Sequence, residues 1–366
     1  MIPLAKPHID KEDIREVVEV LESGALSLGP KIEEFEEKFA KQIGTKYAIA
    51  VNSGTSGLHL CIKALNIKEG DEVITTPFSF IASANCILFE KAKPVFVDVD
   101  EETFNINPEL IEAKITDKTK AILLVHVFGQ SCDMNKIVAI AKKHNLKIIE
   151  DACESINAVY EQKKVGTFGD AAVFAFYPNK QMTTGEGGMI VTNNKEIADL
   201  TKSLRNQGRS NNMQWLTHNL LGYNYRLTDI QAALGISQLN KIDFLISKRQ
   251  ELVNIYLEEL KDVPEITLPK IAKQNIHTWF VFPIIVEEKH RDKLIEYLMS
   301  KQIQSKAYFS PAIHLQDFYK KEFGYKKGDF PIAEKLSKTI LILPLFIGLT
   351  KQNILTIKQA IIDYFS

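Results

Sequence analysis

The sequence predicts an α/β protein with a mostly parallel central sheet and a smaller C-terminal α+β domain. From about residue 47 to 192, short β-rich runs alternate with helical patterns. Most of these runs are continuously apolar, as in strands that are buried on both faces. The chain has 366 residues, which is enough for a large domain and a second, smaller core. We expect the first domain to span residues 1–245 and the second 246–366.

The strands of the predicted sheet are seven short runs: residues 47–51, 73–76, 95–97, 121–127, 147–150, 171–176 and 189–192. Asn107-Pro108-Glu109 has the pattern of a helix start, with a capping residue, a proline and an acid. The remaining predicted elements are helices over 11–22, 31–43, 229–260, 293–301 and 354–364, and a strand over 278–286. The polar, aromatic segment 205–226 is interpreted as a functional loop.

Composition excludes several classes of function. The net charge is −1 with both signs interspersed, so a nucleic-acid or acidic-membrane surface is not expected. No apolar run reaches the length of a membrane span, and the N-terminus lacks a signal-peptide core. The four cysteines form no CxxC pair and lie in or beside apolar runs, which favours buried, reduced thiols over disulfides or a metal site. We therefore expect a cytoplasmic protein without a metal.

Lys180 is the residue on which the function most plausibly depends. It follows a strand-like run and a Pro-Asn turn, and the glycine-rich segment Thr183-Thr-Gly-Glu-Gly-Gly188 leads into the next strand. A lysine held between two buried strands is well placed to form a Schiff base with a carbonyl cofactor. A loop lysine without a function is the alternative if Lys180 is considered alone.

Two further segments suit one cofactor, pyridoxal phosphate. Gly54, Thr55 and Ser56 follow a strand and begin a helix, where a close backbone, hydroxyls and free N–H groups favour a phosphate. Asp151 follows another strand, where a buried carboxylate keeps the ring nitrogen of this cofactor protonated. Helix caps are the alternatives for both segments.

Neighbouring strands would bring Asp151 and Lys180 to opposite edges of one planar ring. Phe80, in a turn after another strand, is a candidate for stacking on that ring, and a core aromatic is equally compatible with the sequence. Serine or cysteine triads, metal ligand sets and dinucleotide-binding fingerprints find no supporting motif.

Taken together, these residues resemble the DegT/DnrJ/EryC1/StrS family of pyridoxal-phosphate sugar aminotransferases. The resemblance covers nearly the whole chain and follows its order. The matching segments are Ile2-Pro-Leu, Leu28-Gly-Pro, Asn52-Ser-Gly-Thr-Ser-Gly-Leu-His59, Glu150-Asp-Ala-Cys-Glu154, the Lys180 segment, Gly222-Tyr-Asn-Tyr-Arg-Leu-Thr-Asp229 and Leu343-Pro-Leu. The family has the aspartate aminotransferase-like fold, known as fold type I of pyridoxal-phosphate enzymes.

The resemblance implies a role for each matching residue. Lys180 would hold the cofactor covalently and move protons, and Asp151 would pair with the ring nitrogen. Phe80 would stack on the ring, and Glu154 would lie near its phenolic oxygen.

Phosphate contacts are implied for Thr55, Ser56 and, from the second subunit of an obligate homodimer with shared active sites, Asn224. Two residues depart from the family pattern. Many members have serine in place of Ala175 and glutamine in place of Glu154. A carboxylate that faced a phenolate would be repelled, so we expect Glu154 to be protonated or turned away.

The function implied is amino transfer from an amino acid, glutamate by resemblance, to a nucleotide-diphosphate keto-sugar. Arg226, Tyr308 and His314 are the candidate substrate contacts, with structural roles as the alternative for each. A pyridoxal-phosphate sugar dehydratase, a non-catalytic binding protein and an aminotransferase for small amino acids are the rival hypotheses. The dehydratase branch carries histidine at the lysine position, so Lys180 argues against it.

Overall fold

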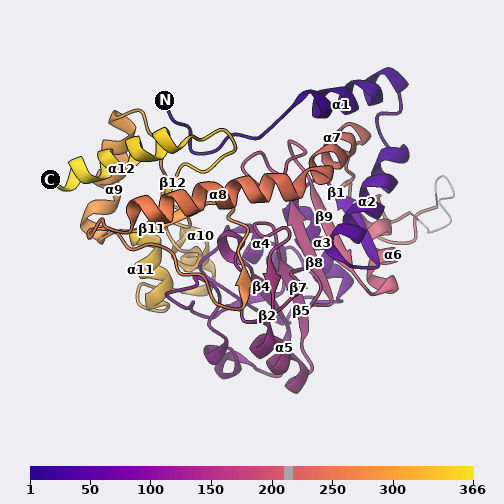
Figure 1. Ribbon diagram of the computed structural model, residues 1–366. Helices are drawn as coiled ribbons and strands as arrows, with labels where there is room; N and C mark the ends of the chain where they lie inside the picture. Colours follow the sequence, from indigo (N-terminus) through magenta and orange to yellow (C-terminus); the bar gives the residue numbers. More distant parts are fainter. Residues whose placement is uncertain (210–216) are drawn as a thin grey trace.

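The computed structural model describes residues 1–209 and 217–366. In this part of the chain, the central element is a seven-stranded sheet with the strand order β1-β9-β8-β5-β4-β2-β3 (Figure 1). Its strands are β1 (Tyr47–Val51), β2 (Glu72–Thr75), β3 (Lys93–Phe96), β4 (Thr119–Val125), β5 (Lys147–Asp151), β8 (Ala171–Ala175) and β9 (Gly188–Thr192). All seven predicted strands are confirmed, with bounds that shift by two residues at most.

The sheet is parallel except at one strand. Strands β3, β2, β4, β5 and β8 pair in parallel, and β9 is antiparallel to both β8 and β1. In the β5–β8 pair, Asp151 lies opposite Val173. The carboxyl ends of β5 and β8 therefore meet at one edge of the sheet, as expected for Asp151 and Lys180.

Helices cover both faces of the sheet. The helices of this part of the chain are α1 (Lys11–Ser23), α2 (Pro30–Ile43), α3 (Gly54–Ala64), α4 (Ala82–Leu88), α5 (Met134–Lys143), α6 (Lys195–Leu204), α7 (Asp229–Asn240) and α8 (Ile242–Leu260), of which α1 packs on α7 rather than on the sheet. Alternate residues of β8 enter different cores: Val173 packs with Leu58 of α3, and Phe174 packs with Phe39 of α2. This burial on both faces explains why the strand sequences are continuously apolar.

The C-terminal part contains a two-stranded antiparallel sheet, β11 (Phe282–Ile285) and β12 (Ile340–Leu343). Its helices are α9 (Glu288–Ser300), α10 (Asp317–Phe323), α11 (Pro331–Thr339) and α12 (Lys351–Phe365). The other elements are β6 (Val159–Tyr160), β7 (Lys163–Lys164), β10 (Asn275–Ile276) and the 3₁₀ turns η1 (Pro108–Leu110), η2 (Glu112–Lys114), η3 (Val127–Gly129) and η4 (Ile313–Leu315).

Four predicted elements were wrong in extent, and one of them is the helix expected over 293–301, which is α9 and begins at Glu288. The helix expected over 229–260 is two helices, because Lys241 leaves the helical conformation and its ammonium binds Asp10 and Asp13. At Asn107 only one 3₁₀ turn forms, although the predicted cap does bond Glu109.

The strand expected over 278–286 is shorter than predicted and begins at Phe282. Trp279 has a φ of 51°, and the Thr278 and Phe280 amides donate to the carbonyls of Gly129 and Phe128. These bonds attach the segment to the loop after β4, so it cannot pair as a strand.

The first residues of the chain connect its two parts. The amide of Ile2 donates to Gln302, and Leu4 accepts a hydrogen bond from Leu345, so this segment lies on the C-terminal part. It then runs across to α1, which packs on α7 (Figure 1). The division at residue 245 stays a prediction.

Three of the four cysteines are buried, as expected. All four cysteines are free, and Cys61, Cys86 and Cys132 are buried, while Cys153 is partly exposed. Among the described residues, no helix combines the length and apolar character that a bilayer span requires.

Two helices are capped by acids that lie far away in the sequence. Helix α2 begins after Gly29, which has no side chain to cap it, and Asp229 accepts the amides of Gly29 and Lys31 at 2.8 and 2.9 Å. Asp98 in the same way accepts the amides of Ile332 and Ala333 at the start of α11, both at 2.9 Å. Each acid fixes a helix relative to a distant segment.

Replacing Asp229 should destabilise the protein measurably. D229A leaves two helix N–H groups without their acceptor, so we expect the free energy of unfolding to fall by about 1–3 kcal/mol. Urea unfolding followed by circular dichroism measures the change. D243A, at an exposed acid in the first turn of α8, is the control and should change stability by less than about 0.5 kcal/mol. Equal effects of D229A and D243A would contradict the capping role.

Candidate active site

Lys180 lies in the loop between β8 and β9. The Lys180 amide donates to the carbonyl of Tyr177 at 2.9 Å, which closes the predicted Pro-Asn turn. The amide of Thr184 donates back to Phe176 at 3.0 Å, and Gly185 has a φ of 79°, a conformation that glycine adopts without strain. The loop is therefore a compact structure that presents the lysine at the sheet edge.

The amine of Lys180 is partly buried and contacts two side chains. Its Nζ donates to Glu154 Oε1 at 3.4 Å and lies 3.8 Å from the centroid of the Phe280 ring. The lysine side chain is only 14% exposed. Such surroundings distinguish Lys180 from an ordinary surface lysine.

Asp151 ends β5 and is buried. The Ser83 hydroxyl of α4 donates to its Oδ2 at 2.7 Å, and the Cys153 amide donates to its Oδ1 at 3.2 Å. A carboxylate has about four acceptor positions, so Asp151 retains capacity for another donor such as a ring N–H⁺.

Glu154 is buried close to both charged groups. Burial raises the pKa of its carboxyl, an effect that Lys180 and the Phe128 amide oppose and Asp151 reinforces. Its Oε2 accepts the Phe128 amide at 2.9 Å, and its Oε1 faces the amine of Lys180. The Glu154 carboxylate is thus turned toward the lysine amine.

The N-terminus of α3 lies beside this loop. Ser53 caps the helix by accepting the Ser56 amide, and the Ser56 hydroxyl is already bonded to Asn52 at 2.7 Å. A Cβ at Gly54 would lie 2.9 Å from both the Ala175 Cβ and the Cys153 sulfur, so only glycine fits there. The Ser56 amide is occupied by the Ser53 cap, while the amides of Gly54 and Thr55 have no intrahelical acceptor and can bind an anion.

Two aromatic residues border the site. Phe80 is 64% exposed, which excludes the core role that the sequence left open. Tyr308 is mostly buried, and burial together with the charge of Glu154 raises the pKa of its hydroxyl to about 12. The structure thus brings Tyr308, from the C-terminal part, close to Glu154.

The remaining predicted residues have different surroundings. Arg226 donates to Asn206 at 3.0 Å. Asn224 is exposed and lies next to Asn52, and the Asn52 amide donates to the carbonyl of Tyr225. His314 is fully buried and bonded to Glu334 at 3.1 Å, which favours the structural role.

The sequence reasoning missed Ser83 and Phe280. Ser83 lies four residues after Ser79, and this spacing was an available signal, since the two hydroxyls are 2.9 Å apart. No local pattern marks Phe280, because it reaches Lys180 only through the tertiary fold.

These residues fit pyridoxal phosphate. The α3 N-terminus offers free amides for the phosphate, and the buried Asp151 offers an acceptor for the ring nitrogen. Lys180 supplies the amine, and Phe80 supplies an exposed aromatic face.

Comparisons with known proteins agree with this arrangement. GDP-perosamine synthase of Escherichia coli O157:H7 is 40% identical over 367 residues, covering 100% of this chain and 99% of that protein. The spore coat polysaccharide biosynthesis protein SpsC of Bacillus subtilis is 39% identical, covering 99% and 96%. The solved structure of Helicobacter pylori PseC, an aminotransferase involved in the biosynthesis of pseudoaminic acid, matches with a TM-score of 0.94 and 32% identity, covering 100% and 99%.

The model of one family matches residues 7–362, almost the full chain. This match, the fold and the fit of the site together settle both the family and its cofactor. The chain belongs to the DegT/DnrJ/EryC1/StrS aminotransferase family, and its cofactor is pyridoxal phosphate.

Proposed function

We propose that this protein transfers an amino group from an amino acid, glutamate by family resemblance, to a nucleotide-linked keto-sugar in the synthesis of an amino-sugar for a polysaccharide or glycan. The observation that carries the proposal is the placement of Lys180 and Asp151 at the ends of adjacent strands, beside the α3 N-terminus. The 40% identity to a GDP-perosamine synthase supports a nucleotide-linked sugar as the acceptor.

The cofactor, when bound, carries the amino group and withdraws electrons from the carbon that exchanges a proton. Lys180 holds the cofactor and, once released, moves that proton with its amine. Asp151 keeps the ring nitrogen protonated, and Ser83 fixes the orientation of its carboxylate. Phe80 covers one face of the ring.

The phosphate is held by the first turn of α3 and by the Thr55 hydroxyl. Ala175 lies against Gly54, so the hydroxyl that a serine would add is missing from the wall of this site. The Ser56 hydroxyl donates to Asn52 and its amide donates to Ser53, so we assign the backbone contacts of the phosphate to the amides of Gly54 and Thr55. Asn224 supplies a further contact from the second subunit.

The sugar nucleotide binds where the C-terminal part borders the cofactor. Tyr308 lies near Glu154 and contacts the sugar. Arg226 is a planar donor suited to diphosphate oxygens. Burial and the charge of Arg209 lower the pKa of Arg226, so an incoming anion would relieve the repulsion between these two cations.

The active enzyme is a homodimer with shared active sites. Ile14, Val18 and Leu21 lie on one face of α1 and are 58%, 41% and 52% exposed. Leu26 and Leu28, which follow α1, are also exposed. An apolar surface of this kind is typical of a subunit interface, and a second copy is the partner that gives Asn224 a function. The free cysteines suit a reducing cytoplasm.

Replacement of Lys180 should abolish amino transfer. K180R keeps the charge but cannot form the cofactor bond, so we expect turnover to fall by at least about a thousandfold. The assay is mass spectrometry of amino-sugar products from glutamate and a panel of nucleotide-linked keto-sugars. K163R, at an exposed lysine of β7, is the control. Near-normal turnover by K180R would refute the assignment, and a dehydrated sugar without nitrogen would indicate the dehydratase.

Replacement of Glu154 should change stability in a pH-dependent way. Burial raises the pKa of Glu154 above its ordinary 4.5, so ionisation of this group opposes folding. This destabilisation of the folded state is absent at pH values below 4.5 and develops as the pH rises through the raised pKa of Glu154. Relative to wild type, cofactor-free E154Q should therefore become more stable as pH increases.

Urea unfolding at several pH values between 4 and 8 measures this difference. E161Q, at an exposed glutamate outside the site, controls for the substitution itself. A stability difference between E154Q and wild type that stays constant or decreases with rising pH would contradict the role of burial.

Mixed dimers test the shared site. If Asn224 acts across the interface, a K180A chain paired with an N224A chain contains one intact site. Co-expression of the two differently tagged chains should then restore about one quarter of the wild-type activity, since half of the dimers are mixed and each has one intact site. The two variant homodimers are the controls. Mixed dimers no more active than N224A homodimers would exclude sharing through Asn224.

A further inference from the structure

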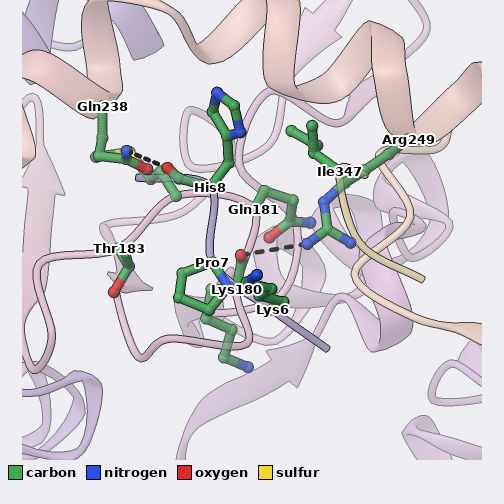
Figure 2. Close-up of a pocket in the computed structure, with 10 residues that line it drawn as sticks. Lys6, Pro7, His8, Lys180, Gln181, Thr183, Gln238, Arg249 and Ile347 are labelled. Atoms are coloured by element: carbon green, nitrogen blue, oxygen red, sulfur yellow. Dashed lines mark hydrogen bonds between the residues drawn. The ribbon is translucent and has the colours of Figure 1, made fainter. Parts of the chain in front are cut away.

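Arg249 of α8 is a buried cation that binds only backbone carbonyls among the described residues. Its Nη1 donates to Trp279, Phe280 and Leu345 at 3.2, 3.3 and 3.4 Å. Its Nη2 donates to the carbonyl of Lys180 at 3.4 Å, as Figure 2 shows. The side chain therefore joins the lysine loop to two segments of the C-terminal part.

Burial of this charge is costly, and nothing nearby neutralises it. Arg249 is 4% exposed and has no carboxylate within ion-pair distance in residues 1–209 and 217–366. Burial lowers its pKa to about 10, so it stays charged at neutral pH. Its Nε has no hydrogen-bond partner among the described residues. An apolar side chain would fill this position at lower cost if packing were the only requirement.

The contacts of Arg249 form a closed circuit around the amine of Lys180. Arg249 binds the backbone carbonyls of both Lys180 and Phe280, and the Phe280 ring lies under the lysine amine. The amide of Phe280 donates to Phe128 at 2.9 Å, and the amide of Phe128 donates to Glu154. Glu154 in turn faces Lys180, which closes the circuit.

We propose that Arg249 is a positioning residue that sets the direction of the Lys180 amine. It fixes the backbone from which the lysine extends and the aromatic face on which the amine rests. The inference deepens the proposed function, on which it depends, since it concerns the same lysine. Arg249 binds the backbone carbonyl of Lys180 and not its amine.

A general role in stability is the alternative, and α8 offers a matched control. Tyr256 lies on the same helix, is fully buried, and donates to the carbonyl of Pro344 at 2.8 Å. It thus also binds α8 to the segment after β12, but in the described part of the chain neither its hydrogen bond nor its ring contact involves the lysine loop. Y256F removes a buried bond from α8 and leaves the circuit around Lys180 intact.

The test measures how fast the cofactor attaches to Lys180, which requires no substrate. Cofactor-free wild type, R249M, R249K and Y256F are mixed with pyridoxal phosphate, and the absorbance of the attached cofactor is followed by stopped flow. Borohydride reduction and peptide mass spectrometry then verify attachment at Lys180. Unfolding midpoints are measured for each variant, and kcat and KM are determined with the best acceptor.

We expect R249M to attach the cofactor about 10–100-fold more slowly and to lose kcat by a similar factor while KM changes little. R249K keeps the charge without the fork of donors and should fall between R249M and wild type. Y256F should attach the cofactor at the wild-type rate even if its unfolding midpoint falls as far as that of R249M.

Attachment by folded R249M within twofold of the wild-type rate would overturn the inference, as would an equal slowing by Y256F. If R249M does not fold, R249K decides the question by the same comparison. A wild-type protein that attaches no cofactor would refute the proposed function itself and the inference with it. Attachment by wild type and R249M at equal rates would refute the inference alone.

Discussion

The structure around the site depends on two buried acids at the end of β5, Glu150 and Asp151. Each buried carboxylate needs hydrogen-bond donors. Glu150 accepts the amides of Gly166, Phe168 and Gly169 at 2.7, 2.8 and 2.7 Å, and thereby fixes the loop that leads into β8. Asp151 binds Ser83 of α4 in the same way. Because an unsatisfied buried carboxylate is costly, these acids determine where the neighbouring segments lie.

Glu154 shows how the same rule changes the chemistry of the site. The sequence comparison predicted that it would be protonated or turned away from the phenolic oxygen of the cofactor. In the structure its two oxygens serve different partners, the Phe128 amide and the amine of Lys180. Burial favours the protonated acid, and the lysine favours the carboxylate. Glu154 therefore links the lysine amine to the backbone after β4 through its two oxygens.

The C-terminal part contributes residues to the surroundings of Lys180 and Glu154. Phe280, Tyr308 and Arg249 all come from beyond the predicted division at residue 245, and all are close to Lys180 or Glu154. Asp98 ties α11 to the segment after β3, and the first residues of the chain cross back to the C-terminal part. These connections limit how far the two parts can move apart while the lysine stays in place.

Sequence alone determined the seven strands of the central sheet, helices α1 and α2, and the placement of Asp151 and Lys180 at the ends of adjacent strands. Buried parallel strands require continuous apolar runs, and residues at their ends meet at one edge of the sheet, so local patterns carry this information. Only the tertiary structure decided the break at Lys241, the burial of His314 and the contact of Arg249 with the lysine loop. In each case a buried polar group forms hydrogen bonds with a partner that is distant in the sequence. Local sequence patterns do not contain this information.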